Sequence, residues 1–303
     1  MASAGSEEAS CNLVYDGTLE LKGFKRRADR KPDYNGVVVT EDTLLVTDYN
    51  ERNLQLYSRR DGKLMSSHTL ESRPYGVCLI SKTVVAVCLW KSIVILSFKS
   101  VDDVKLVKTL DVRTGFTYCD SVAKLNSDKL VVSGGNYNYG MLCWGVVSIT
   151  DGRLDSIHNI CKGYWTHLAI KENTVYISSQ TYHSTTTGGV YAYDIFNPHT
   201  HKFLYQHKEL ERPYSIMAGR DSFFVNDWDS KRIHQLTDSG QLVTIHTVSS
   251  SFSEIFYDDQ HGVLYTTSLN SNVITVYKME YLHQPDSVIP AEVLKMDTRS
   301  LQM

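Results

Sequence analysis

Several features that identify common classes of protein are missing from this chain of 303 residues. No apolar stretch is long enough to cross a bilayer or to form a signal-peptide core, so neither a membrane span nor a secretory leader is predicted. No stretch of ten or more residues keeps the 3.6-residue period of an amphipathic helix, which predicts almost no helix. Glycine pairs occur, but no helix follows them to bind phosphate, and no Gly-x-Ser-x-Gly elbow of a serine hydrolase occurs.

Cysteine is sparse and the charges are nearly balanced. The six cysteines stand singly, and several fall in predicted strands, where a free thiol acts as a small apolar side chain. The chain also has no Asn-x-Ser/Thr glycosylation acceptor. These absences predict a reduced, cytoplasmic setting. A formal net charge of -3 argues against a strongly electrostatic nucleic-acid binder.

What the chain does contain is a unit of about 40 to 48 residues that occurs six times. The units begin at Gly36, Gly76, Ser121, His167, Ser215 and Glu254. Each holds four short apolar runs separated by polar, aromatic or glycine-containing turns. In the first unit the runs are 36–39, 43–47, 53–57 and 64–70, and in the fifth they are 215–218, 222–226, 232–236 and 242–248. Alternating patterns and β-branched or aromatic residues dominate, so each run is predicted to be a strand.

Repeated units of four short antiparallel strands are typical of propeller blades, because one such sheet buries both faces only when neighbours stack around an axis. The prediction is therefore an all-β, six-bladed β-propeller. The sixth unit supplies only three strands, and residues 18–22 are expected to close the ring as its outer strand, which also removes exposed sheet edges. The rival segment 287–294 contains Pro290, which would interrupt a ladder. The expected organisation is a flexible lead at 1–11, one propeller at 12–280 and a tail at 281–303.

Two segments, 46–57 and 225–236, resemble the NHL repeat. In each, an apolar strand ends in Asp, a polar turn and a basic residue follow, and a second apolar strand leads to a glycine turn. The resemblance covers the whole propeller in period but is sharp only in units one and five. Units three and four contain Gly134-Gly135 and Gly188-Gly189, which resemble kelch repeats, and the Gly-His and Trp-Asp pairs of WD repeats are absent.

The chain is thus similar to the C-terminal NHL propeller of tripartite-motif (TRIM-NHL) proteins. The zinc-binding RING and B-box parts of those proteins need closely spaced Cys and His ligands, which this sequence lacks. The resemblance therefore implies that any ubiquitin-ligase chemistry would come from another chain.

Aromatic residues gather at two sets of turns that a propeller places on one face: the turns into each first strand and those joining the second strand to the third. Tyrosine and tryptophan give large contact areas and keep a polar group for a wet rim. The candidate partner-binding residues on this face are Tyr49, Arg52, Arg73, Tyr75, Trp90, Lys91, Tyr118, Trp165, Tyr182, Arg212, Tyr214 and Trp228. The alternative for any single ring is packing between blades. For the two Arg-Pro-Tyr tripeptides, 73–75 and 212–214, it is that proline simply fixes the turn into a strand.

The charges expected on this face are mixed, which leaves the type of ligand open. Single-stranded RNA would use the rings for stacking and arginine for phosphate, and the NHL resemblance implies that such binding is possible. Six acidic residues suit a peptide or protein better. They are Asp48, Glu51, Asp120, Asp227, Asp229 and Glu254.

An enzymatic alternative rests on position alone. Asn35, Asp120 and Glu254, with His167 nearby, could point toward the axis, as in gluconolactonase-like six-bladed hydrolases that hold a divalent metal. Asp and Asn at strand starts more often cap turns. His199 and His201 are two histidines with no further metal-binding residues beside them in the sequence, which favours a solvated loop over a zinc site.

The sequence therefore predicts a non-enzymatic binding module for a protein or peptide, with no cofactor, no metal and no membrane partner. Single-stranded RNA binding is the second hypothesis, and metal-dependent, lactonase-like hydrolysis is the third.

Overall fold

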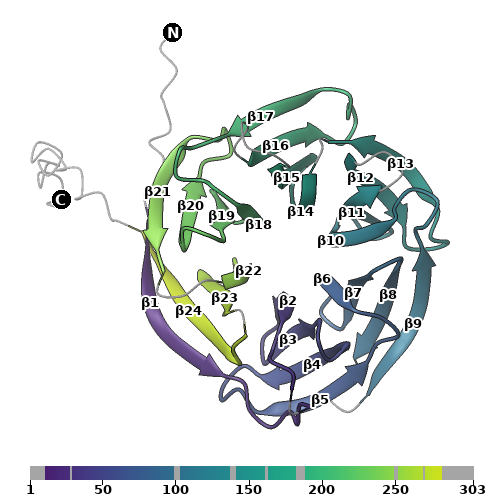
Figure 1. The fold of residues 1–303 in the computed structure, drawn as a ribbon, viewed down its shortest axis with the longest axis vertical. Helices are drawn as coiled ribbons and strands as arrows, with labels where there is room; N and C mark the ends of the chain where they lie inside the picture. The colour runs from purple at the N-terminus through teal and green to yellow at the C-terminus, as the bar shows by residue number, and fades with distance from the viewer. Residues whose placement is uncertain are drawn as a thin grey trace, which may run out of the picture.

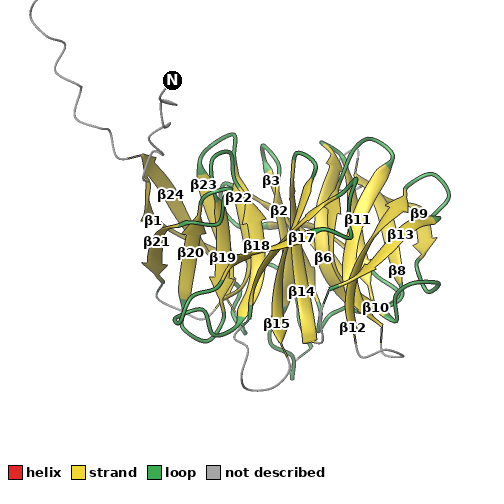
Figure 2. Cartoon of the chain, turned by 90° about the horizontal axis from the view of Figure 1, so that it is seen from above, coloured by secondary structure: helices red, strands yellow, loops and turns green. Residues whose placement is uncertain are grey.

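The computed structural model describes residues 11–27, 29–98, 103–136, 141–160, 163–181, 188–248, 252–268 and 270–281. Its strands form six four-stranded antiparallel sheets, which are arranged as blades around a central axis (Figure 1). The predicted all-β, six-bladed propeller is confirmed. The described residues contain no helix that is long and apolar enough to cross a membrane. Seen from the side, the turns gather on the two faces of the ring (Figure 2).

The strands of each blade follow one another from the axis outward. Blade 1 contains β2 (Tyr34–Val39), β3 (Thr43–Asp48), β4 (Asn53–Ser58) and β5 (Leu64–Thr69). Blade 2 contains β6 (Pro74–Ser81), β7 (Val84–Leu89), β8 (Ser92–Phe98) and β9 (Val104–Asp111). Blade 3 contains β10 (Tyr118–Lys124), β11 (Lys129–Asn136), β12 (Met141–Ser148) and β13 (Leu154–Asn159). Blade 4 contains β14 (Gly163–Lys171), β15 (Thr174–Thr181), β16 (Gly189–Asp194) and β17 (His201–Tyr205). Blade 5 contains β18 (Pro213–Ala218), β19 (Phe223–Asp227), β20 (Arg232–Leu236) and β21 (Leu242–Thr247).

Blade 6 closes the ring with strands from both ends of the chain. It contains β22 (Phe252–Asp258), β23 (Val263–Ser268), β24 (Val273–Tyr281) and, as its outer strand, β1 (Cys11–Glu20). Figure 1 shows β1 in purple beside β24 in yellow. The predicted closure by the N-terminal segment is confirmed, but the strand is longer than 18–22, because the ladder continues past a bulge between Tyr15 and Gly17. The rival segment 287–294 and the predicted tail lie outside the described residues, as do residues 1–10.

Apolar side chains fill the space between neighbouring blades. The residues of the second strand of each blade are almost all buried, as in β3 and β19. Between blades 2 and 3 the core includes the thiols of Cys88, Cys119 and Cys143, all fully buried. The expectation that several cysteines act as small apolar residues is confirmed for these three, and together they help to bury one blade against the next.

Every inner strand is bulged near its start, on the face where the chain enters the blade. The register shifts lie between Tyr34 and Gly36, Pro74 and Val77, Cys119 and Ser121, Gly163 and Trp165, Pro213 and Ile216, and Phe252 and Ile255. A bulge inserts an unpaired residue and re-aims side chains that would otherwise alternate. The bulge in β10 illustrates this: the backbone N–H of Thr166 donates to Asp120 at 3.4 Å, and that of Leu168 donates to the next residue, Ser121, at 3.3 Å.

Hydroxyl groups tie the bulges of neighbouring blades together. On the second strand of a blade, a Ser or Thr donates to a backbone carbonyl at the start of the next inner strand. Thr47 donates to Tyr75 at 2.8 Å, Ser133 to Thr166 at 3.3 Å, Ser178 to Tyr214 at 3.4 Å and Thr267 to Tyr34 at 3.2 Å. These bonds satisfy buried carbonyls and hold the blades in register around the axis.

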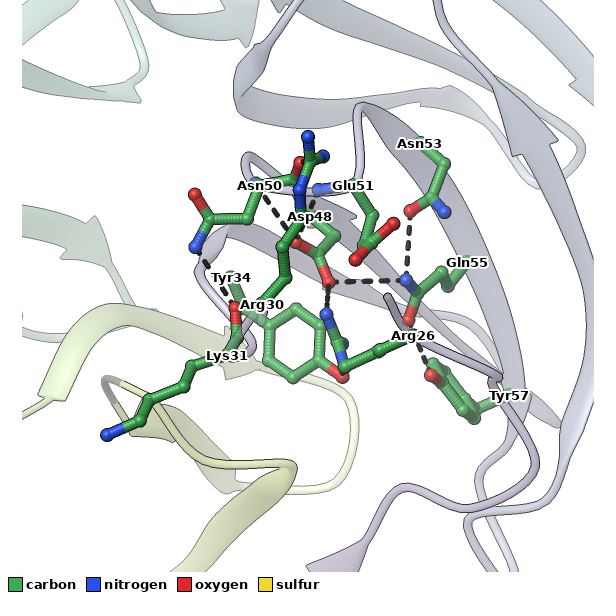
Figure 3. Close-up of polar contacts among 10 residues, drawn as sticks. All are labelled: Arg26, Arg30, Lys31, Tyr34, Asp48, Asn50, Glu51, Asn53, Gln55 and Tyr57. Carbon is green, nitrogen blue, oxygen red and sulfur yellow. Dashed lines mark hydrogen bonds and ion pairs between the residues drawn. The ribbon is translucent and has the colours of Figure 1, made fainter. Parts of the chain in front are cut away.

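The Asp of the two sharpest repeat units is a structural residue. The carboxylate of Asp48 accepts hydrogen bonds from the N–H groups of the following turn, at 3.1 Å from Asn50 and 3.2 Å from Glu51, and it is paired with Arg26 (Figure 3). Asp227 accepts from the N–H groups of Glu211 and Arg212 at 3.0 and 2.9 Å. Each carboxylate therefore fixes a turn or connection on one face of the ring. We call it the axial face and define it as the face formed by the turns into each inner strand and the turns that join the second strand of a blade to the third.

The basic residue of the repeat pattern ends the same turn. Arg52 and Lys231 occupy equivalent positions, and both have a positive φ of 55°. A turn that finishes with a residue in the left-handed region is a common hairpin connection. The sequence pattern in these two units thus encodes the shape of the turn, and the side chains of Arg52 and Lys231 are exposed.

Candidate functional site

Five of the predicted aromatic residues form one contiguous cluster across four blades. This aromatic cluster comprises Tyr49, Tyr75, Trp90, Tyr118 and Trp165. The ring of Tyr75 lies at its centre, with centroids 5.3 Å from Tyr49, 6.0 Å from Trp90 and 6.1 Å from Trp165. Trp90 also stacks on Tyr118 at 5.5 Å, and Tyr118 lies 6.4 Å from Trp165. The structure therefore brings together side chains that are separated by more than a hundred positions in sequence.

The rings of this cluster differ in how they meet the solvent. Tyr75 and Tyr118 are only 4% and 5% exposed, so they support the others from below. Tyr49, Trp90 and Trp165 are half-buried and present part of each ring at the surface. The glycine pair of blade 3 makes room for this arrangement, because a side chain at Gly135 would place its Cβ 2.3 Å from the Tyr118 ring.

Basic side chains border the aromatic cluster. The guanidinium of Arg73 lies 4.6 Å from the centre of the Tyr49 ring and donates a hydrogen bond to its hydroxyl at 2.8 Å. The cation–π contact and the hydrogen bond together hold this exposed arginine beside the Tyr49 ring. Arg52 and Lys91 follow Tyr49 and Trp90 in the same two turns and are exposed. Eight of the predicted residues thus form one patch over blades 1 to 4.

Three of the four remaining predicted residues, Arg212, Tyr214 and Trp228, form a second, smaller group on blade 5. Tyr214 packs at 4.9 Å against Trp228 and at 4.8 Å against His167. Arg212 is engaged by Asp229, with Nη1 to Oδ1 at 3.1 Å. Tyr182 lies outside the described residues. The two groups share the axial face, and the structure shows no ring contact between them among the described residues.

The expected balance of charge on this face needs correction. Four of the six acidic residues predicted there are buried: Asp48, Asp120, Asp227 and Glu254. Asp48 and Asp227 are used in turns, as described above. Glu51 is half-buried and Asp229 is exposed. The side chains that reach solvent beside the aromatic cluster are therefore more basic than the sequence suggested.

Five buried polar residues lie at or next to the bulges of the inner strands of blades 3 to 6. We name this group the axial crown and define it as Asp120, Thr166, His167, Ser215 and Glu254. All five residues are buried, and Glu254 Oε1 lies 3.3 Å from Nδ1 of His167. Asp120 is 1% exposed and Glu254 is 7% exposed. The repeat places His167, Ser215 and Glu254 at equivalent positions of blades 4, 5 and 6, since each begins a unit.

Burial controls the protonation of the axial crown. It raises the pKa of Asp120 and of Glu254 well above the usual range of a carboxyl group, and it lowers the pKa of His167 to about 3. Burial therefore favours the neutral forms of both carboxyl groups and of the imidazole. Nearby on the same face, burial raises the pKa of Asp33 to about 6, an effect that the charge of Asp48 reinforces.

Three residues of the crown were predicted from the sequence, but as possible metal ligands. Asp120, Glu254 and His167 were expected near the axis together with Asn35. The part of the chain that the structure describes contains no group of three or more His, Cys, Asp and Glu side chains arranged to hold a metal ion. Thr166 and Ser215 were not singled out, because hydroxyl residues in a strand carry no functional signal by themselves.

Beneath the crown, the inner strands of all six blades line a central channel of about 270 Å³. Its walls are mainly apolar, with Val77, Val122 and Ile255 among them, and His167 and Glu254 also line it. A larger pocket of about 590 Å³, near Glu41 and Lys82 on the opposite face, contains none of the predicted site residues. The predicted face is therefore a surface of rings above a narrow channel and not a deep cleft.

Comparisons with known proteins show the fold alone. No protein-family model matches the chain, and no curated protein matches its sequence. Among solved structures, the chain is similar to a luciferin-regenerating enzyme (TM-score 0.64, 13% identity, 90% of this chain and 96% of that one). It is also similar to the Cps50 (Swd1) β-propeller domain of Myceliophteria thermophila (TM-score 0.60, 11% identity, 85% and 84%).

A third similar structure is a chain of a nidogen/laminin complex (TM-score 0.57, 11% identity, 78% of this chain and 94% of that one). These neighbours include an enzyme and a member of a protein complex. At such low identity, a shared propeller architecture does not transfer function.

Proposed function

We propose that this propeller is a non-enzymatic binding module that recognises a protein or peptide through its aromatic face. The observation that carries the proposal is the aromatic cluster, in which two buried tyrosines support three half-exposed rings. Large, rigid aromatic side chains beside a fixed arginine are the residues that dominate binding energy at protein interfaces. The fold adds a further argument, since propellers commonly present one face to protein partners.

An acidic group on the aromatic face favours a peptide over a nucleic acid. Asp33 is half-buried, and the backbone N–H of Tyr49 donates to its carbonyl at 2.9 Å. Burial raises the pKa of its carboxyl group to about 6, so the group is largely ionised at neutral pH. An ionised carboxyl group on a binding face repels a phosphate backbone, whereas it attracts basic side chains of a peptide. Asp33 therefore supports the peptide hypothesis beside the Tyr49 ring.

Single-stranded RNA is the second candidate, and one observation favours it. Because four expected acidic residues are buried, the exposed rim beside the rings is dominated by Arg52, Arg73 and Lys91. Rings for stacking and arginines for phosphate are the usual elements of single-strand binding. The NHL resemblance of blades 1 and 5 supports both candidates, and with it we propose a TRIM-NHL-like, cytoplasmic recognition protein.

Selection from a random peptide library on the immobilised protein tests the first hypothesis. Selected peptides are titrated against the wild type and against Trp90→Ala and Trp165→Ala, with folding checked by thermal unfolding. Each substitution should weaken binding by about 2 kcal/mol if the ring is an anchor. The matched control is Phe196→Ala, since Phe196 is 79% exposed on a turn of the opposite face and should have no effect.

Unchanged affinity in folded Trp90→Ala and Trp165→Ala would show that the wrong face was chosen. RNA binding is measured separately, by filter binding of a random single-stranded RNA at several salt concentrations. Salt-sensitive binding that is lost in the same variants, with no peptide selected, would favour RNA over peptide.

A further inference from the structure

The connection between β1 and β2 is strongly basic. Residues 22–31 contain six lysines and arginines but a single acidic residue. Lys25, Arg27 and Lys31 are exposed, and Arg30 is half-buried. We call these four residues the basic connection. They lie before the first repeat unit, so the repeat pattern does not explain why they are basic.

Hydrogen bonds fix the basic connection along the turn that follows Tyr49 (Figure 3). Arg30 donates to the backbone carbonyl of Asn50, and the side-chain amide of Asn50 donates to the carbonyl of Lys31 at 3.0 Å. The backbone N–H of Tyr49 donates to the carbonyl of Asp33 at 2.9 Å. The basic connection therefore borders the axial face directly beside the aromatic cluster.

This placement joins the basic connection to the cations that were described at the aromatic cluster. Arg52 ends the same turn that Arg30 contacts, and Arg73 lies 4.6 Å from the centre of the Tyr49 ring. Lys91 follows Trp90 in the corresponding turn of blade 2. We define the basic rim as Lys25, Arg27, Arg30, Lys31, Arg52, Arg73 and Lys91.

The side chains of the basic rim form no ion pair with a carboxylate among the described residues. Arg26, in the same connection, shows the contrast, because it pairs with the buried Asp48. Arg73 has a carboxyl group nearby, since its charge opposes the rise in the pKa of Asp33. A surface with this many uncompensated cations attracts anionic partners.

Carboxyl groups interspersed along the rim favour acidic side chains over a phosphate backbone. Asp29 and Glu71 are exposed, and Asp33 is half-buried. A nucleic acid carries a charge at every phosphate and would place some of these charges beside the carboxyl groups, which weakens binding. A peptide carries carboxylates only where its sequence provides them, so it can pair with the cations and pass the carboxyl groups with neutral residues.

We propose that the basic rim and the aromatic cluster together bind an acidic peptide segment. Carboxylates of the segment pair with the rim, and an aromatic or apolar side chain packs on the half-exposed rings. The inference rests on the proposed function and adds the chemical class of the partner. Asp33 accommodates one basic side chain, but the segment is negative overall. Exposed ion pairs are individually weak and screened by salt, so the rings supply the anchor and the rim supplies the salt dependence.

The first test is the composition of the peptides that the full-length protein selects from the random library at low ionic strength. Asp and Glu should be enriched at least about twofold over the unselected library, because each one can pair with a rim cation. A selected peptide is then titrated beside an analogue in which Asn and Gln replace its Asp and Glu. The analogue should bind about tenfold more weakly at low salt, the combined effect of several exposed pairs, and the difference should shrink at high salt.

The second test reverses rim charges that have no side-chain hydrogen bond among the described residues. The variant combines Lys25→Glu, Arg27→Glu and Lys31→Glu. It should bind the acidic peptide about tenfold more weakly at low salt and with a shallower salt dependence. The matched control makes the same change in net charge at exposed residues away from the axial face, and it combines Arg60→Glu, Lys124→Glu and Lys202→Glu. It should bind like the wild type, with folding of both variants checked by thermal unfolding.

A ring variant separates the two parts of the surface. Trp90→Ala should weaken binding at every salt concentration and leave the salt dependence unchanged, because its ring carries no charge. Selected peptides without an excess of acidic residues, or equal losses in the rim variant and its control, would overturn this inference and leave the proposed function standing. Selection of no peptide at all would contradict both. Loss of single-stranded RNA binding in the rim variant, with no acidic peptide selected, would assign the rim to phosphate instead.

Discussion

Replacement of Asp48 by Asn should destabilise the protein far more than replacement of its repeat equivalent, Asp227. The side chain of Asp48 is fully buried, and the guanidinium of Arg26 paired with it is only 15% exposed. Burial raises the pKa of Asp48 despite this pair, so the pair as a whole contributes little net stability. Removal of one partner is different, because it leaves the other charge buried and unpaired.

The magnitude follows from the contacts. Asp48→Asn leaves Arg26 without a counter-charge, which costs about 3–5 kcal/mol in comparable buried pairs. Asp227 accepts hydrogen bonds from two backbone N–H groups and from Ser230 at 2.7 Å, and the structure pairs it with no cation among the described residues. Asp227→Asn should therefore cost about 1–3 kcal/mol, the penalty of unsatisfied buried groups.

Equilibrium unfolding in urea measures both changes, with Asp229→Asn as the control. Asp229 pairs with Arg212 at the surface, so its replacement should cost no more than about 1 kcal/mol. The double variant Arg26→Leu with Asp48→Asn should recover part of the loss, since it removes the unpaired charge. A loss for Asp48→Asn that is no larger than that for Asp227→Asn, or no recovery in the double variant, would refute the reasoning.

Three further predictions concern the glycine pair, the ring closure and pH. Gly135→Ala forces its Cβ into the Tyr118 ring and should lower both stability, by about 1–3 kcal/mol, and the near-ultraviolet circular dichroism of the aromatic cluster. Deletion of residues 1–20 removes β1 and exposes the edge of β24, so the shortened protein should melt earlier and aggregate in size-exclusion chromatography. Burial raises the pKa of Asp33 to about 6, so its contribution to stability is greatest below pH 4 and is lost as the pH rises through 6. Asp33→Asn should therefore be more stable than the wild type at pH 8, and identical urea midpoints there would contradict this.

Much of the fold could be predicted from the sequence, because the sequence consists of repeated units. One blade cannot bury both faces of its sheet, so six copies of the same strand pattern predict six blades. The three-stranded sixth unit likewise predicted a closing strand near residues 18–22, which the structure extends to Cys11–Glu20. The extension was not foreseen, because residues 11–17 pair with β24 across a bulge that interrupts their alternating pattern.

The candidate site could be predicted only in part from the sequence. Turn positions placed the rings on one face, and the structure joins Tyr49, Trp90 and Trp165 through the buried Tyr75 and Tyr118. The acidic residues were misjudged, because a carboxylate that caps a turn and one that faces solvent look alike in sequence.

The sequence by itself determined the number of blades, the alternation of strands and turns, and the face on which the aromatic residues would meet. Local pattern carries that information, since strand pairing within a blade joins neighbours in the chain. Only the tertiary structure decided which side chains are exposed and which lie buried around the axis. The bulge in β10, for example, directs a carboxyl oxygen of Asp120 to the backbone N–H of Thr166 in blade 4. That contact joins two blades and residues 46 positions apart, so no single segment encodes it.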